Sequence, residues 1–231
     1  MNLGRSILRP YWAPGSGPGQ GHLAQSTRIQ EWENGVKALR LYWHCLDLGQ
    51  QEEEETRNWL DELRQLLAQP PTQADLCVSN VPSDISEVFD MELRRCPITP
   101  QPMERYLDAI ITKLGHSYSD LWKWTPLLVR CLEDSPIALA AKKENPLAEW
   151  GIALGLWAVV YAMNNKYIIW HESLHLYTAE DCYCRENPEG PTTCELPGCI
   201  MQYAPCEGKV APWPFLCRKN LDHVRSYRPF A

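Results

Sequence analysis

Two histidines and a glutamate stand inside an apolar stretch of this chain, in the order His171-Glu172-Ser173-Leu174-His175. The apolar residues around them predict a largely buried helix that begins near Tyr167. Residues four apart project from one face of a helix, so both imidazoles can reach one zinc ion. Glu172 stands near enough to take a proton from a water molecule at the metal. Because buried histidines and carboxylates need polar partners, we expect a zinc site; the alternative is a surface helix with two unrelated histidines.

A third protein ligand is expected, because a catalytic zinc ion has three protein ligands and one open position. Asp181 follows His175 by six residues. Other carboxylates in the same region stay open as the third ligand: Glu180, Glu186, Glu189 and Glu195. His223 is a further candidate, although a lone histidine is more often solvated.

The spacing of these residues resembles that of the metzincin zinc peptidases. His171-Glu172-x-x-His175-x-x-Thr178-x-x-Asp181 is similar to the motif of the snapalysin-like metzincins, in which an aspartate is the third zinc ligand. The later segment Cys199-Ile200-Met201-Gln202-Tyr203 resembles the metzincin Met-turn. The resemblance implies a zinc-dependent peptidase that hydrolyses peptide bonds, with Glu172 as the general base. It implies that Zn²⁺ is held by His171, His175 and Asp181, above Met201 as a hydrophobic floor.

Tyr203 occupies the place where some metzincins have a tyrosine that binds zinc or stabilises the oxyanion. A buried structural tyrosine is the alternative. The resemblance covers residues 157–220 and has departures. Thr178 stands where metzincins have a glycine that lets the chain turn sharply, and a β-branched residue suits such a turn poorly. The segment Trp157–Tyr161 is expected to be a strand, and the resemblance makes it the edge strand that binds an extended substrate through backbone pairing.

Cysteines are concentrated near the metal motif. Six lie in the last fifty residues: Cys182, Cys184, Cys194, Cys199, Cys206 and Cys217. A dense cluster indicates disulfides in an oxidising compartment or a metal site in a reducing one.

The positions of these cysteines resemble those in the archaemetzincins. That family has one cysteine directly after the third zinc ligand, one before the Met-turn methionine and a pair further along the chain. Cys182, Cys199 and Cys217 match three of these four places, and Asn220 stands at the fourth. The missing thiolate is left open among Cys184, Cys194 and Cys206. We expect the three matching cysteines to meet, around a second metal or partly as a disulfide.

The remaining pattern predicts an α+β fold with a helical N-terminal part. Residues 1–26 are rich in Gly and Pro and are predicted to be a disordered leader. Residues 27–70 are predicted to be helical, with one helix through Trp43 and a second after Gly49. Pro70-Pro71 is the expected boundary, and residues 71–231 are expected to form a zincin-like catalytic domain.

The charge and hydropathy of the chain speak against nucleic-acid binding and against a membrane-spanning protein. A net charge of −7 without a basic stretch speaks against nucleic-acid binding. No apolar run approaches the roughly 20 residues of a transmembrane helix, and no export signal is visible, so we expect an intracellular protein that does not bind membranes. The resemblance to zinc peptidases implies that its partner is a peptide or protein substrate. The alternative function is a non-catalytic, cysteine-rich interaction protein stabilised by zinc or disulfides.

Overall fold

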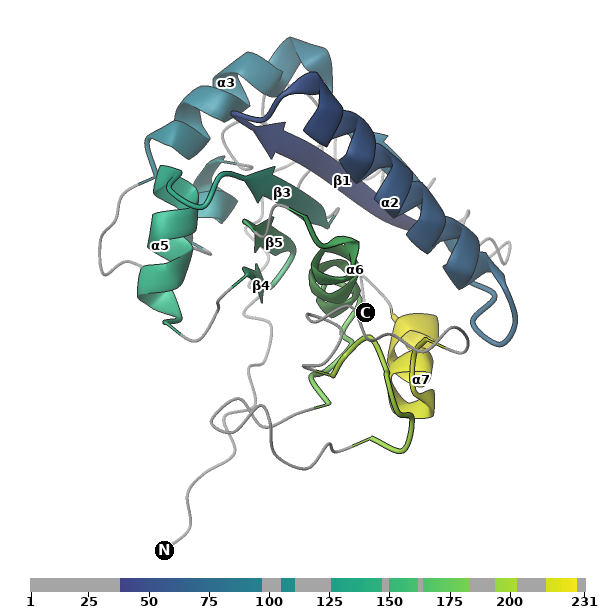
Figure 1. The fold of residues 1–231 in the computed structure, drawn as a ribbon. Helices are drawn as coiled ribbons and strands as arrows, with labels where there is room; N and C mark the ends of the chain where they lie inside the picture. Colours follow the sequence, from purple (N-terminus) through teal and green to yellow (C-terminus); the bar gives the residue numbers. More distant parts are fainter. Residues whose placement is uncertain are drawn as a thin grey trace, which may run out of the picture. The chain divides into compact units, whose positions relative to one another are not determined.

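A five-stranded sheet forms the centre of the described chain, with the strand order β2-β1-β3-β5-β4 (Figure 1). The computed structural model describes residues 38–96, 105–110, 126–146, 150–161, 164–182, 194–202 and 215–227. The strands are β1 Ala38–Leu46, β2 Asp75–Asn80, β3 Leu127–Cys131, β4 Gly151–Leu154 and β5 Trp157–Val160. Strand β4 runs antiparallel to β5, and all other neighbouring strands are parallel. This mixed sheet and its helices confirm the α+β class.

Helices cover both faces of the sheet. They are α2 Gln50–Ala68, α3 Ser83–Arg94, α5 Pro136–Glu144, α6 Lys166–His175 and α7 Arg218–Ser226, and residues 105–110 are also helical. One core joins α2, α6 and α7 to alternate residues of β1, such as Leu41 and Trp43. A second core, on the opposite face, joins α3 and α5 to residues such as Trp157 and Val159 of β5. The fold therefore places α6 between the sheet and the C-terminal helix.

The first strand corrects the sequence-based prediction for residues 27–70. Residues 38–46 form β1 and not a helix. Leu39 and Trp43 are four residues apart, a spacing that suits one face of a helix and one face of a strand equally. Leu41 and Cys45 are also buried, so every second residue of this segment faces the core, which is the period of a strand. Because β1 pairs with both β2 and β3, the sheet extends across the expected boundary at Pro70-Pro71. The predicted leader lies outside the described residues.

Several other elements agree with the sequence. The helix after Gly49, the strand near Trp157 and the helix near Tyr167 are all present. The helix α3, the strand β4 and the helix α7 were not expected. The unexpected β4 also changes the role of β5, which is an inner strand; the edge beside it is β4.

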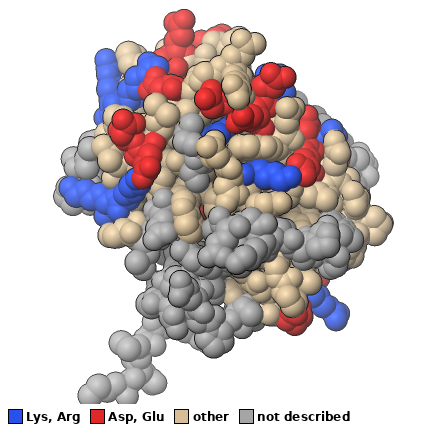
Figure 2. Space-filling model, in the orientation of Figure 1, with Lys and Arg blue, Asp and Glu red and all other residues tan. Residues whose placement is uncertain are grey.

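The described surface carries charges of both signs. On the face shown in Figure 2, Lys and Arg side chains lie among Asp and Glu side chains and form no continuous basic area. Within the described ranges, no helix is both long and apolar enough to cross a membrane.

Candidate functional site

Helix α6 is held at its first residue by a cap and near its middle by a contact with α2. It begins after Asn165, whose side-chain oxygen accepts a hydrogen bond from the Tyr167 backbone N–H at 3.0 Å, a standard N-cap. The Trp170 indole donates to the Trp59 backbone carbonyl of α2 at 2.7 Å. His171 is 4 % exposed and lies in the middle of this buried helix. The apolar packing of α6 therefore determines where its polar side chains point.

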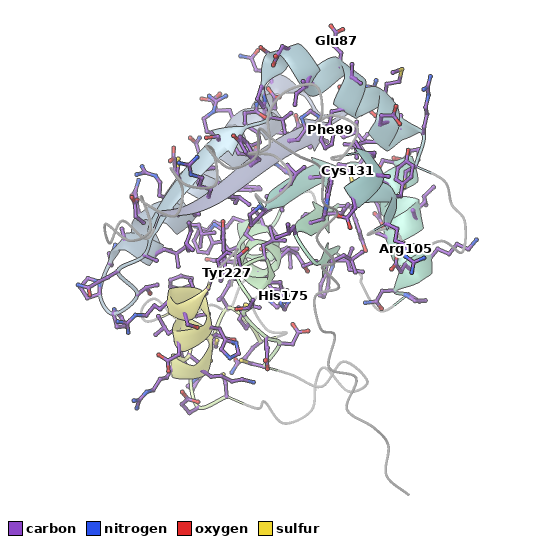
Figure 3. All side chains as sticks on the ribbon, turned by 180° about the vertical axis from the view of Figure 1, so that it is seen from behind. Glu87, Phe89, Arg105, Cys131, His175 and Tyr227 are labelled. Carbon is purple, nitrogen blue, oxygen red and sulfur yellow. The ribbon has the colours of Figure 1, made fainter. Side chains whose placement is uncertain are left out.

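Three predicted ligand atoms meet at the end of α6. The Nε2 atoms of His171 and His175 are 3.0 Å apart. The Asp181 Oδ1 atom lies 3.2 Å from the first and 3.1 Å from the second. Figure 3 labels His175 at this end of α6, in the part of the molecule that holds α7 and away from Phe89 on α3. The three atoms form a nearly equilateral triangle.

The outer nitrogens of both imidazoles are hydrogen-bonded to backbone carbonyls. His171 Nδ1 lies 2.8 Å from the Ile200 carbonyl, and His175 Nδ1 lies 2.7 Å from the Ala179 carbonyl. A carbonyl oxygen only accepts, so both Nδ1 atoms carry the proton. Both Nε2 atoms consequently face each other and Asp181, with their rings held in the orientation typical of metal-binding histidines.

Asp181 and the two imidazoles shift each other's pKa values. Burial acts to raise the pKa of the Asp181 carboxyl, but hydrogen bonds from His171 and His175 hold that pKa well below its usual range. Burial acts to lower the pKa of His171, yet the hydrogen bond to Asp181 and the nearby carboxylates raise it. Both shifts come from the close approach of the carboxylate to the imidazoles.

The chain reverses immediately after α6 and so brings Asp181 back to the histidines. The Ala179 N–H donates to the Leu174 carbonyl at 3.2 Å, and the Thr178 N–H donates to the His175 carbonyl at 2.9 Å, the pattern of a Schellman motif. Thr178 adopts a left-handed φ of 68°. This residue thus makes the turn that metzincins make with glycine, although a β-branched side chain is strained there.

Thr178→Gly should relieve this strain. The left-handed conformation costs a residue with a Cβ about 1–2 kcal/mol, and the greater freedom of unfolded glycine offsets about 0.5–1 kcal/mol of the gain. We expect the free energy of unfolding to rise by about 0.5–1 kcal/mol in urea denaturation. Thr178→Ala keeps the Cβ and is the control, with little change expected. A less stable glycine variant would contradict the assigned turn.

A tight turn at Cys199–Gln202 supports the first histidine. The Gln202 N–H donates to the Cys199 carbonyl at 2.9 Å, and the Ile200 N–H donates to the Phe215 carbonyl at 2.8 Å. Met201 within it is fully buried. The Ile200 carbonyl accepts a hydrogen bond from His171 Nδ1. The predicted Met-turn is therefore directly linked to the triangle. Tyr203 lies outside the described residues.

Glu172 lies on the sheet side of α6 and is 8 % exposed. Its side chain reaches the edge strand, where a Cβ built on Gly151 would lie 3.0 Å from Glu172 Cγ. The described carboxylates outside the triangle are placed elsewhere. Glu180 is exposed and pairs with Lys219 at 2.6 Å, and Glu195 is exposed. Glu186 and Glu189 lie outside the described residues.

Four cysteine sulfurs form a second group next to the first. The Sγ atoms of Cys182, Cys194, Cys199 and Cys217 all lie within 4.8 Å of one another. Cys182 and Cys217 are 3.7 Å apart, far longer than a disulfide bond, and the cysteines that the structure describes form no disulfide. The three cysteines expected to meet therefore do so, and Cys194 is the fourth member. Cys184 and Cys206 lie outside the described residues.

Nitrogen donors surround these sulfurs. Asn220 Nδ2 donates to Cys182 Sγ at 3.3 Å, Gln202 Nε2 donates to Cys194 Sγ at 3.2 Å, and the Cys217 backbone N–H donates to Cys199 Sγ at 3.3 Å. The hydrogen bond from Cys182 and the backbone donors lower the pKa of Cys199 to about 6. The hydrogen bond with Cys199 raises the pKa of Cys182, and burial raises the pKa of Cys217 to about 11. Cys199 is therefore the thiolate that these donors stabilise, and the thiolate is the form of cysteine that binds metals.

Two of these supporting residues escaped the sequence analysis. Asn220 stands at the place of the fourth archaemetzincin cysteine and donates a hydrogen bond to Cys182. Its place in the archaemetzincin pattern was the one sequence signal for this role. Gln202 gave no signal in the sequence. His223 donates to the Thr178 carbonyl at 2.9 Å and supports the turn after α6.

Comparison with protein-family models, with curated proteins and with solved structures finds no match for this chain.

Proposed function

We propose that this chain is a zinc-dependent peptidase of the metzincin type. The observation that carries the proposal is the triangle of His171, His175 and Asp181, with ligand-atom distances of 3.0–3.2 Å and both imidazoles oriented through Nδ1. A surface helix with two unrelated histidines would not place them in this way.

The donor set fits zinc. Two imidazole nitrogens and one carboxylate oxygen make a common catalytic zinc site. Bonds of about 2.0–2.1 Å in a tetrahedron separate the ligand atoms by about 3.3–3.4 Å, close to the separations in the triangle. The three residues fill three positions of a tetrahedron and leave the fourth for water or substrate.

Glu172 supplies the proton transfer in this proposal. Zinc bound by the triangle would act as a Lewis acid and lower the pKa of a water molecule to about 7. Glu172 directly follows His171 on the helix that carries both histidines. With zinc bound, Glu172 would accept a proton from the water that attacks the scissile carbonyl, and would return it to the nitrogen of the leaving amine.

The sheet offers a place for an extended substrate. Among the strands that the structure describes, β4 lies at the edge of the sheet, the kind of position at which a peptide strand can pair. Glu172 lies against the inner side of this strand at Gly151. A peptide paired with β4 would therefore lie on the strand that contacts Glu172.

The four-cysteine group is proposed to hold a second, structural zinc ion. Zinc–sulfur bonds of about 2.3 Å in a tetrahedron place sulfurs about 3.8 Å apart, and Cys182 and Cys217 are 3.7 Å apart. Four protein ligands close a zinc site to water. This group by itself also favours the second candidate function, a zinc-stabilised interaction protein without catalysis.

Asp181→Ala tests whether Asp181 or the neighbouring Glu180 is the third zinc ligand. Loss of the carboxylate should lower the affinity for the catalytic zinc by at least about tenfold, because two ligands remain of three. Glu180→Ala, which removes a surface ion pair with Lys219, is the matched control and should leave that affinity unchanged. Competition with a chromogenic chelator measures both. The reverse order of effects would transfer the ligand role to Glu180.

A further inference from the structure

We propose that Gly151 is a positioning residue for Glu172: the absence of a side chain there keeps the Glu172 carboxylate in its place beside the edge strand. This inference rests on the proposed peptidase function and adds a residue to its site. It begins from the contact between β4 and α6, which the sequence motifs do not include.

A methyl group at residue 151 would meet three atoms at once. It would lie 3.0 Å from Glu172 Cγ, 3.1 Å from the Val159 carbonyl oxygen and 3.3 Å from Glu172 Oε1. Carbon atoms in ordinary van der Waals contact are about 3.5–4.0 Å apart. An alanine at this position therefore requires one of these neighbours to move.

The conformation of the backbone does not explain this glycine. Gly155 and Gly198 have positive φ angles, whereas Gly151 lies in regular extended structure, paired with Val160. Glycine within a strand costs about 0.5–1 kcal/mol relative to alanine. The remaining role for Gly151 is to provide room, and two of the three atoms that need this room belong to Glu172.

Glu172 is the neighbour that would move. Val159 is fully buried and paired on both sides, with Ile152 of β4 and Val129 of β3, so its carbonyl cannot shift without disturbing the sheet. The Glu172 side chain can rotate about its own bonds. A methyl group at residue 151 would thus push the carboxylate away from β4 and change its position relative to the metal ligands.

The expected effect falls on turnover. A displacement of about 1 Å at a reacting group costs up to about 100-fold in rate, so a shift of a few tenths of an ångström should lower kcat roughly tenfold. The methyl group faces α6 and not the outer edge of β4, so KM should change less than twofold. The acid limb of the kcat–pH profile should also shift, because the surroundings of the general base change.

Gly151→Ala is compared with Ala153→Gly, which alters the same face of the same strand two residues further along and adds no methyl group. The proposal expects normal zinc content in both variants, the loss of kcat and the shifted pH profile only in Gly151→Ala. Gly151→Ala with wild-type kcat and pH profile would overturn it.

A double-mutant cycle tests the contact without any assay of activity. Gly151→Ala is made in the wild type and in Glu172→Ala, and the urea midpoint of unfolding is measured for all four proteins. The proposal expects Gly151→Ala to lower the midpoint when Glu172 is present, and to lower it less or raise it when Glu172 is absent, because alanine is favoured over glycine in a strand by about 0.5–1 kcal/mol. Equal drops would overturn the inference. A wild type that hydrolyses no peptide would instead overturn the proposed function, and the cycle would still decide whether Gly151 controls the position of Glu172.

Discussion

Glu172→Gln should lower peptide hydrolysis by about 10²–10⁴-fold while the zinc content stays at the wild-type level. Glutamine has nearly the same shape but cannot accept the proton of the attacking water at neutral pH. The fold should tolerate the change, because the side chain keeps its contact with Gly151 and its place on α6. Turnover of a general peptide substrate and elemental analysis of the same sample measure the two effects.

The control for this variant is Glu180→Gln. Glu180 lies eight residues further along, is exposed and pairs with Lys219, so full activity is expected. A Glu172→Gln protein with full turnover would refute the role of general base. Loss of zinc from it would mean that Glu172 is a ligand.

Cys194→Ser should remove the structural zinc and destabilise the fold by about 4 kcal/mol or more, the range that loss of a metal site produces. Serine does not replace a thiolate as a zinc ligand, and Cys194 is the least buried of the four cysteines, so its packing is the least disturbed. Denaturant unfolding and zinc content measure the effect. Cys77→Ser is the control, because Cys77 is exposed on β2.

The same variant should also weaken the catalytic site. Cys182 directly follows Asp181, and its N–H donates to the Met201 carbonyl at 2.7 Å. The neighbouring Ile200 carbonyl holds His171. Changes in such supporting contacts lower metal affinity by about 10–100-fold, so a similar loss is expected at the triangle. Cys194→Ser with two zinc ions and wild-type stability would contradict the proposed four-thiolate site.

The sequence predicted the helix of the site well, because a single local pattern determines it. Asn165, the apolar run and the two histidines four apart all indicate α6. The position of β1 was not predicted, since Leu39 and Trp43 suit either period. Only the pairing of β1 with β2 and β3 decides between them, and such pairing is a property of the whole sheet.

The supporting residues of the site were harder to predict than its ligands. Thr178 was expected to resist the turn after α6, yet it adopts φ 68°, because the Schellman hydrogen bonds and His223 hold the turn from both sides. Cys194 was one of three open choices, and the sequence alone does not show that its sulfur lies beside those of Cys182, Cys199 and Cys217. Gly151 has no motif, and its role emerges only where β4 meets α6.

Zinc content of the purified wild type beside His171→Ala tests the central claim most directly. The proposed account predicts two zinc ions per chain in the wild type and one in the variant, because His171 holds only the catalytic ion. Cys194→Ser analysed in parallel should lose the other ion and His171→Ala/Cys194→Ser should lose both. Equal zinc content in the wild type and His171→Ala would contradict the account, since the triangle at the end of α6 would then bind no metal.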